Sequence, residues 1–118
     1  MKPRLPWVTA CALSVLMPSE RWVQVGGNAD VHRDYLDRES IKRSGSKVTL
    51  WTRRDFVTRQ RTVWNEIEVD CMNKRDTVLA YIEDDAGSIS HNTVRPHRGS
   101  TAIPPGSVGE RVFDLVCR

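Results

Sequence analysis

The stretch KVTLWTRRDF, residues 47–56, decides the fold of this chain. Val48 and Leu50 fall on one side of a strand drawn through it. Trp51 and Arg53 fall on the other side. Alternation with a period of two is typical of a strand with one face against a core and the other toward water. The stretch therefore predicts a strand in an antiparallel sheet.

The same alternation and a set of turn signals extend this sheet along the chain. Further strands are expected at residues 62–72 and 77–83, and shorter β-prone runs at residues 22–25, 31–36 and 88–94. Clusters of Gly, Asn, Asp and Ser separate the runs, and the first run ends at Gly26-Gly27-Asn28. We expect one antiparallel sheet of about six strands, with the polar last run at an edge.

A short amphipathic helix is expected to close the chain. Ser107 and Glu110 stand in the pattern of a capping box. The apolar residues on one helical face are Val108, Val112, Leu115 and Val116, with Phe113 at its margin. This stripe must be covered, and the apolar face of the sheet is the candidate. The fold class is therefore α+β, with one helix packed on one face of the sheet.

The N-terminal residues 1–20 have the pattern of a removable leader. Lys2 and Arg4 precede a mostly apolar run over residues 5–17, which is the order of a secretory signal. The run is shorter than the ~20 residues that a membrane-spanning helix needs. We expect a signal peptide at residues 1–20, with its cleavage point left open, and one domain at residues 21–118.

Two other interpretations of the leader stay open. Residues 8–11, Val-Thr-Ala-Cys, resemble a bacterial lipobox, in which Cys11 becomes the lipidated first residue of an anchored protein. Alternatively, the N-terminus is an uncleaved hydrophobic segment or a wrongly assigned start. Export places the protein in the periplasm or on the outer-membrane surface.

The cysteines fit an exported chain. The sequence holds three cysteines, and Cys11 lies in the leader, so that Cys71 and Cys117 remain as a pair. Two cysteines in an exported domain usually form a disulfide. A bond across so long a loop contributes about 4 kcal/mol in the chain-entropy model. Two unpaired buried thiols are the alternative, and two cysteines without further Cys or His partners do not predict a metal site.

Composition and motifs argue against several function classes. With 18 Lys and Arg against 15 Asp and Glu, the net charge of +3 is too small to indicate a nucleic-acid binder. His32, His91 and His97 lack metal-ligand spacing, and residues 106–109 lack the pattern of a nucleophile elbow. We therefore expect no enzyme, no catalytic residue, no metal and no cofactor.

The candidate binding residues are aromatic and basic side chains on the wet face of the central strands. Trp51, Arg53 and Trp64 are expected to point outward, and Trp and Arg are enriched at interface hot spots. A basic group that could contact acidic glycans or an acidic protein segment consists of Arg53, Arg54, Arg59 and Arg61. The alternatives are tryptophans packed under a loop or against arginine stems, and a solvated basic hairpin.

Several short motifs also stand in a familiar order along the chain. They are Trp22-Val23-Gln24-Val25, Tyr35-Leu36-Asp37, Ser40-Ile41, Val48 to Trp51, Glu68-Val69-Asp70-Cys71, Ile103-Pro104-Pro105-Gly106-Ser107 and a terminal helix ending in Cys117. Together they resemble the bacterial surface-adhesin E family over roughly residues 21–118. The resemblance implies an antiparallel sheet of about six strands with a C-terminal helix tied on by a disulfide.

The resemblance also implies a small exported or lipid-anchored envelope protein. Its expected partner is a protein, such as a host extracellular-matrix protein or another envelope protein. Self-association into a homodimer through the outward tryptophans is a further expectation. Contact with a membrane is expected only through a lipid at Cys11. The alternative function is a periplasmic structural or accessory protein without a host ligand.

Overall fold

The alternating stretch forms strand β4 (Lys47–Phe56) in a computed structural model that describes residues 20–93 and 99–118. Strand β2 (His32–Asp37) pairs with β4 on one side and strand β5 (Arg61–Asp70) on the other, and both pairs are antiparallel. The strand that the alternation predicts is therefore confirmed, and it lies in the interior of the sheet.

The main path of the sheet has the order β1-β2-β4-β5-β6-β7. Strand β1 (Trp22–Asn28) ends this path on one side, and β7 (Ser88–Thr93) ends it on the other, next to β6 (Arg75–Asp85). Two short strands lie off the path: β3 (Lys42–Ser44) pairs with β4, and β8 (Thr101–Ala102) pairs with β6. Every pairing is antiparallel, as the sequence predicted.

The described sheet has eight strands, and the expectation of about six was wrong. The additional strands are β3 and β8, and neither leaves a pattern in the sequence. Lys42, Arg43 and Ser44 of β3 are all exposed, so no apolar residue marks this strand. Strand β8 has two residues, which is too short for any hydrophobic period to be detected.

Strand β1 continues through Gly26 and Gly27, where the sequence predicted a turn. A register shift between Gln24 and Gly26 marks a bulge. Gly27 has a φ of +127°, and a Cβ there would lie 2.4 Å from the carbonyl oxygen of His32. A Cβ at Gly26 would lie 2.9 Å from Cγ2 of Val108. The two glycines therefore permit a close approach of neighbouring segments inside a strand.

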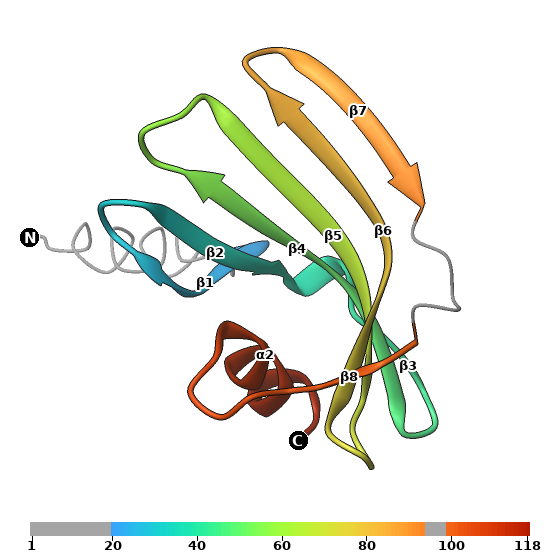
Figure 1. Ribbon diagram of the computed structural model, residues 1–118. Helices are drawn as coiled ribbons and strands as arrows, with labels where there is room; N and C mark the ends of the chain where they lie inside the picture. The colour runs from blue at the N-terminus through green and yellow to red at the C-terminus, as the bar shows by residue number, and fades with distance from the viewer. Residues whose placement is uncertain (1–19, 94–98) are drawn as a thin grey trace, which may run out of the picture.

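Helix α2 (Val108–Val116) lies on the concave side of the curved sheet (Figure 1). The hydroxyl of Ser107 accepts a hydrogen bond from the backbone N–H of Glu110 at 3.1 Å. The carboxylate of Glu110 in turn accepts a hydrogen bond from the backbone N–H of Gly106 at 2.9 Å. The predicted helix start at Ser107 is confirmed.

The core lies between α2 and the concave face. Its buried residues are Val25, Leu36, Val48, Leu50, Ile67, Val69, Ile103, Val112 and Val116. Leu115 is 47% exposed, so the prediction that it belongs to the buried stripe of the helix was wrong. This nine-residue helix buries the i, i+4 pair Val112 and Val116, which is a narrower stripe than the sequence suggested.

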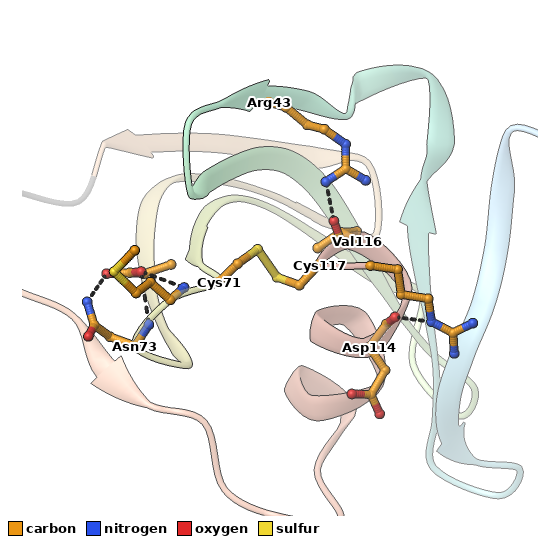
Figure 2. Close-up of a disulfide and its surroundings, with 9 residues drawn as sticks. Arg43, Cys71, Asn73, Asp114, Val116 and Cys117 are labelled. Atoms are coloured by element: carbon orange, nitrogen blue, oxygen red, sulfur yellow. Dashed lines mark hydrogen bonds between the residues drawn. A yellow bond between two sulfur atoms is a disulfide. The ribbon is translucent and has the colours of Figure 1, made fainter.

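A disulfide joins Cys71, after β5, to Cys117 at the end of α2, which confirms the predicted pair (Figure 2). The two Cα atoms lie 5.4 Å apart across a sequence separation of 46 residues. Arg43 of β3 donates a hydrogen bond to the carbonyl oxygen of Val116 close by. The C-terminal end of the helix is thus tied to the β5–β6 turn and to the β3–β4 hairpin.

The leader predicted at residues 1–20 lies outside the described residues except for Glu20. Cys11 and His97 lie outside them as well. In the part of the chain that the structure describes, no helix combines the length and the apolar character of a membrane span.

Candidate functional site

The outer face of the sheet, opposite to α2, carries a group of aromatic side chains. Leu50 packs into the core, so its neighbour Trp51 points to the outer face. Trp51 lines a groove of about 370 Å³ together with Trp22, Trp64, Ile82 and Ile89. We call these five residues the aromatic groove. It holds every tryptophan of the described residues.

Strand register brings the groove residues together from five strands. Trp64 of β5 lies opposite Arg53 of β4 and opposite Ile82 of β6. Ile82 in turn lies opposite His91 of β7. Opposite residues in an antiparallel pair share a face. The row Arg53, Trp64, Ile82 and His91 therefore crosses the outer face from β4 to β7, the edge strand. There Ile89, two residues from His91 on the same strand, is 70% exposed.

Arg53 supports one wall of the groove. Its guanidinium carbon lies 4.4 Å from the ring centroid of Tyr35 and 4.7 Å from that of Trp22. Its Nε lies 3.1 Å from Oδ1 of Asp55. A guanidinium held between two rings and paired with a carboxylate fixes the position of Trp22 through cation–π contact. Arg53 is therefore a positioning residue on the same face as Trp51 and Trp64.

Arg21 and Asp37 close the groove at its other end. Arg21 donates two hydrogen bonds to the carboxylate of Asp37, from Nε at 3.0 Å and from Nη2 at 2.9 Å. This hydrogen-bonded ion pair raises the pKa of Arg21 above its usual value. Asp37 is 2% exposed and also accepts the backbone N–H of Glu39 at 3.0 Å, at the start of the short 3₁₀ helix η1 (Arg38–Ser40). The pair is electrically balanced and anchors the start of β1.

The predicted basic group does not form one surface. Arg54 follows Arg53 directly in β4, so it points to the concave side, where its Nε lies 2.6 Å from Oδ1 of Asp34. Arg61 also faces that side, where it pairs with Glu83 at 2.7 Å and lies over the ring of Phe56. Arg59 is exposed in the β4–β5 turn. The structure thus distributes Arg53, Arg54, Arg59 and Arg61 over two faces and a turn.

A second hollow of about 440 Å³ lies on the concave side, beside α2. The carboxylate of Asp34, which is 5% exposed, is one of the polar groups that line it. Arg54 binds one oxygen of this carboxylate, and Nδ1 of His32 lies 3.0 Å from the other. Arg54 and the buried carboxylate of Asp34 therefore satisfy each other in this hollow.

The family model of surface-adhesin protein E matches residues 22–118, which contain the whole described sheet, the disulfide and α2. The chain belongs to the surface-adhesin protein E family. This confirms the resemblance found in the sequence motifs. No curated protein and no solved structure gives a significant match to the chain.

Membership in the adhesin E family indicates a surface protein of the adhesin kind and suggests a role other than catalysis. Among residues 20–93 and 99–118, no cluster of three or more His, Cys, Asp or Glu side chains is arranged to hold a metal ion. The feature of this adhesin E family member that stands out is therefore the aromatic groove.

Sequence reasoning identified Trp51 and Trp64 but missed the other three groove residues. The sequence places Trp22 in a family motif and does not indicate that it lies on the outer face. Ile82 lies in β6, which pairs with β5, and Ile89 lies in β7, which pairs with β6; neither pairing can be seen in the local sequence. Counting alternate residues in both directions from the hairpin turn at residues 86–87 would have placed Ile82 and Ile89 on one face.

Proposed function

We propose that this adhesin E family member is a non-catalytic, exported cell-envelope protein that binds a protein partner through the aromatic groove. A host extracellular-matrix protein is the partner class that this proposal favours. The observation that carries the proposal is the gathering of Trp22, Trp51, Trp64, Ile82 and Ile89 in one open groove on the face opposite to the core.

The physical support comes from the kind of surface that the groove offers. Tryptophan buries a large area on binding and loses little side-chain entropy, which is why it is frequent among hot-spot residues. The groove lies on hydrogen-bonded strands, which hold its side chains in place before a partner arrives. Its polar neighbours Arg21 and Asp37 satisfy each other, so a partner can cover them without leaving either charge unpaired.

The location of the protein is part of the same proposal. A signal peptide at residues 1–20 would export the chain, and a lipid at Cys11 would hold it at a membrane. Apart from Glu20, these residues lie outside the described structure. A periplasmic accessory protein without a host ligand is the competing proposal.

Binding of the exported protein to a panel of immobilised extracellular-matrix proteins tests the proposal. Trp51→Ala should weaken binding to the matrix protein that the wild type recognises by at least about tenfold, the effect of losing one hot-spot side chain. Met72→Ala is the matched control, since Met72 is an exposed apolar residue in the turn after β5. The control should bind like the wild type.

Folding must be measured on the same samples by thermal unfolding. Trp51 bonds to Ser40 through its backbone N–H, and that bond survives the loss of the indole. Unaltered binding by Trp51→Ala, or no binding by the wild type to any matrix protein, would contradict the proposal. The second result would favour the periplasmic accessory protein.

A further inference from the structure

The two outer strands of the sheet differ in how their free edges are treated. Strand β1 bulges at Gly26, approaches Val108 of α2 closely, and has the carbonyl oxygen of Val25 bound by Arg111 at 3.3 Å. Strand β7 reads Ser-Ile-Ser-His-Asn-Thr, six residues without Lys, Arg, Asp, Glu or Pro. Proteins usually protect an edge strand with charge, proline or a bulge. Strand β1 has such protection, whereas residues 88–93 of β7 supply none of these features themselves.

The backbone of β7 offers regular hydrogen-bonding groups at this edge. A two-residue turn of Ala86 and Gly87, both with positive φ, joins β6 to β7, so Asp85 and Ser88 form the first hydrogen-bonded pair. Hydrogen-bonded and non-hydrogen-bonded pairs then alternate along the ladder. The N–H and C=O groups of Ile89 and His91 consequently point away from β6, toward the free edge.

The aromatic groove meets this edge, and the charge beside it is negative. Ile89 lies opposite Asp84, and Trp51 lies opposite Glu66. Neither carboxylate has an ion-pair partner within residues 20–93 and 99–118. The backbone N–H of Gly87 holds the Asp84 carboxylate in place at 2.9 Å. Arg21 and Arg53, which lie beside the groove, are in contrast already paired with aspartates.

We propose that the protein partner supplies an extended segment that adds to β7 as a further strand of the sheet. Its side chains on the outer face alternate between apolar residues, which pack beside Ile89, and basic residues, which reach Asp84. Strand addition gains affinity from main-chain hydrogen bonds and specificity from alternate side chains. This inference rests on the proposed function, because it names how the same groove is filled.

The reach of a basic side chain fits the spacing of the strands. An added strand would lie two spacings, roughly 10 Å, from β6. An extended Lys or Arg covers most of that distance, and the Asp84 side chain covers the remainder. Glu66 lies one strand further away and contributes only to the negative potential of the outer face.

A designed peptide tests the inference on the exported protein. The probe is acetyl-Val-Thr-Lys-Thr-Val-Thr-Lys-Thr-amide, whose Val and Lys residues share one face when it is extended. Its control replaces both Lys residues with Glu. Neither peptide contains Trp, so the emission of the groove tryptophans reports binding directly. The Lys peptide should change this emission saturably and should bind at least about tenfold more tightly than the Glu peptide.

His91→Pro removes an outward N–H without touching the pairing to β6, and His91→Ala keeps that N–H. The first variant should lose at least about tenfold in affinity for the Lys peptide, and the second should bind like the wild type. Asp84→Asn, which keeps the acceptor for Gly87, should abolish the preference for Lys over Glu. Equal binding of the two peptides, or equal binding by the two His91 variants, would overturn the inference.

If His91→Pro fails to fold, amide hydrogen exchange on the wild type tests the added strand instead. The Lys peptide should slow exchange of Ile89 and His91, whereas Ser90 is already protected by its bond to β6. Unchanged exchange at Ile89 and His91 with peptide bound would contradict the inference. So would a wild-type dimer that His91→Pro separates, because a second copy would then occupy the edge.

The two proposals fail in different ways. If Trp51→Ala loses matrix binding while His91→Pro keeps it, the groove binds the partner and the added strand is wrong. If Trp51→Ala also keeps matrix binding, the proposed function itself is wrong.

Discussion

The two faces of the sheet are built from the same strands, yet they differ in how far their side chains are exposed and in what covers them. On the concave face, Leu50 and Val69 are 0% and 1% exposed and pack in the core with α2. On the outer face, Trp51 and Trp64 stay partly exposed, and α2 lies on the opposite, concave side of the sheet (Figure 1). One covered face is enough to hold the strands in register, and the other face is left with large aromatic side chains in contact with solvent.

The largest effect should come from the disulfide that holds α2 on the concave face. Cys117→Ser should destabilise the domain by about 4 kcal/mol, because the unfolded chain regains the freedom of a long open loop. Chemical denaturation measures this loss, and the double variant Cys71→Ser with Cys117→Ser controls for a stray thiol. Wild-type thermal midpoints that agree with and without reductant would contradict a stabilising bond.

Adjacent residues of β4 sharpen the comparison of the two faces. Leu50→Ala should lower the free energy of unfolding by about 3 kcal/mol, since it leaves a cavity under α2. Trp51→Ala should lower it by less than about 1 kcal/mol, since its side chain lies outside the core. Unfolding in denaturant compares the two. Equal losses would mean that Trp51 is part of the core and that the outer face is not free for binding.

The neighbouring arginines of β4 give the next smaller effects. Arg54→Met leaves the buried carboxylate of Asp34 with His32 alone and should cost about 2 kcal/mol. Arg53→Met removes the cation between Tyr35 and Trp22 and should cost about 1 kcal/mol. Only Arg53→Met should shift the tryptophan emission, because Arg54 faces the other side. A shift of the same size in the tryptophan emission of Arg54→Met would contradict the placement of the two arginines on opposite faces.

The smallest predicted effect concerns Asp76, which faces the first turn of α2. Burial raises the pKa of Asp76 above its usual value. The folded protein then holds a proton at pH values where the unfolded chain has lost it, so stability falls as pH rises through the pKa of the folded state. Asp76→Asn should remove this cost and stabilise the domain at pH 7, by at most about 0.5 kcal/mol because solvent screens the group.

The pH dependence of the stability gained by Asp76→Asn tests whether the carboxylate charge is its cause. Thermal unfolding of the wild type and of Asp76→Asn should differ at pH 7 and converge near pH 3, where the carboxyl group is protonated in both states. A gain at pH 3 as large as that at pH 7 would show that the carboxylate charge is not its cause.

Local patterns in the sequence were sufficient for much of the fold. The alternation in residues 47–56 predicted β4, and Ser107 predicted the start of α2. The cysteine count predicted the bond between Cys71 and Cys117. Each of these signals is complete within a short segment or a residue count. The same alternation predicted that Trp51 and Trp64 would point outward.

Features that depend on pairing between distant strands were not accessible in the same way. The register shifts between Glu66 and Ile67, so that Ile67 lies opposite Val78 while Trp64 lies opposite Ile82. The bulge therefore puts Val78 and Ile82 on different faces, although simple alternation puts them on the same face. A one-residue shift is decided by packing across the sheet, and the local sequence does not record it.

One spectrum tests directly whether a partner covers the aromatic groove, as we propose. Trp22, Trp51 and Trp64 all lie in the groove, so fluorotryptophan labelling of the exported protein reports on this surface and on nothing else in residues 21–93 and 99–118. Addition of a matrix protein that binds the wild type should shift or broaden all three fluorine resonances. A bound complex in which all three resonances keep their positions and widths would contradict the claim.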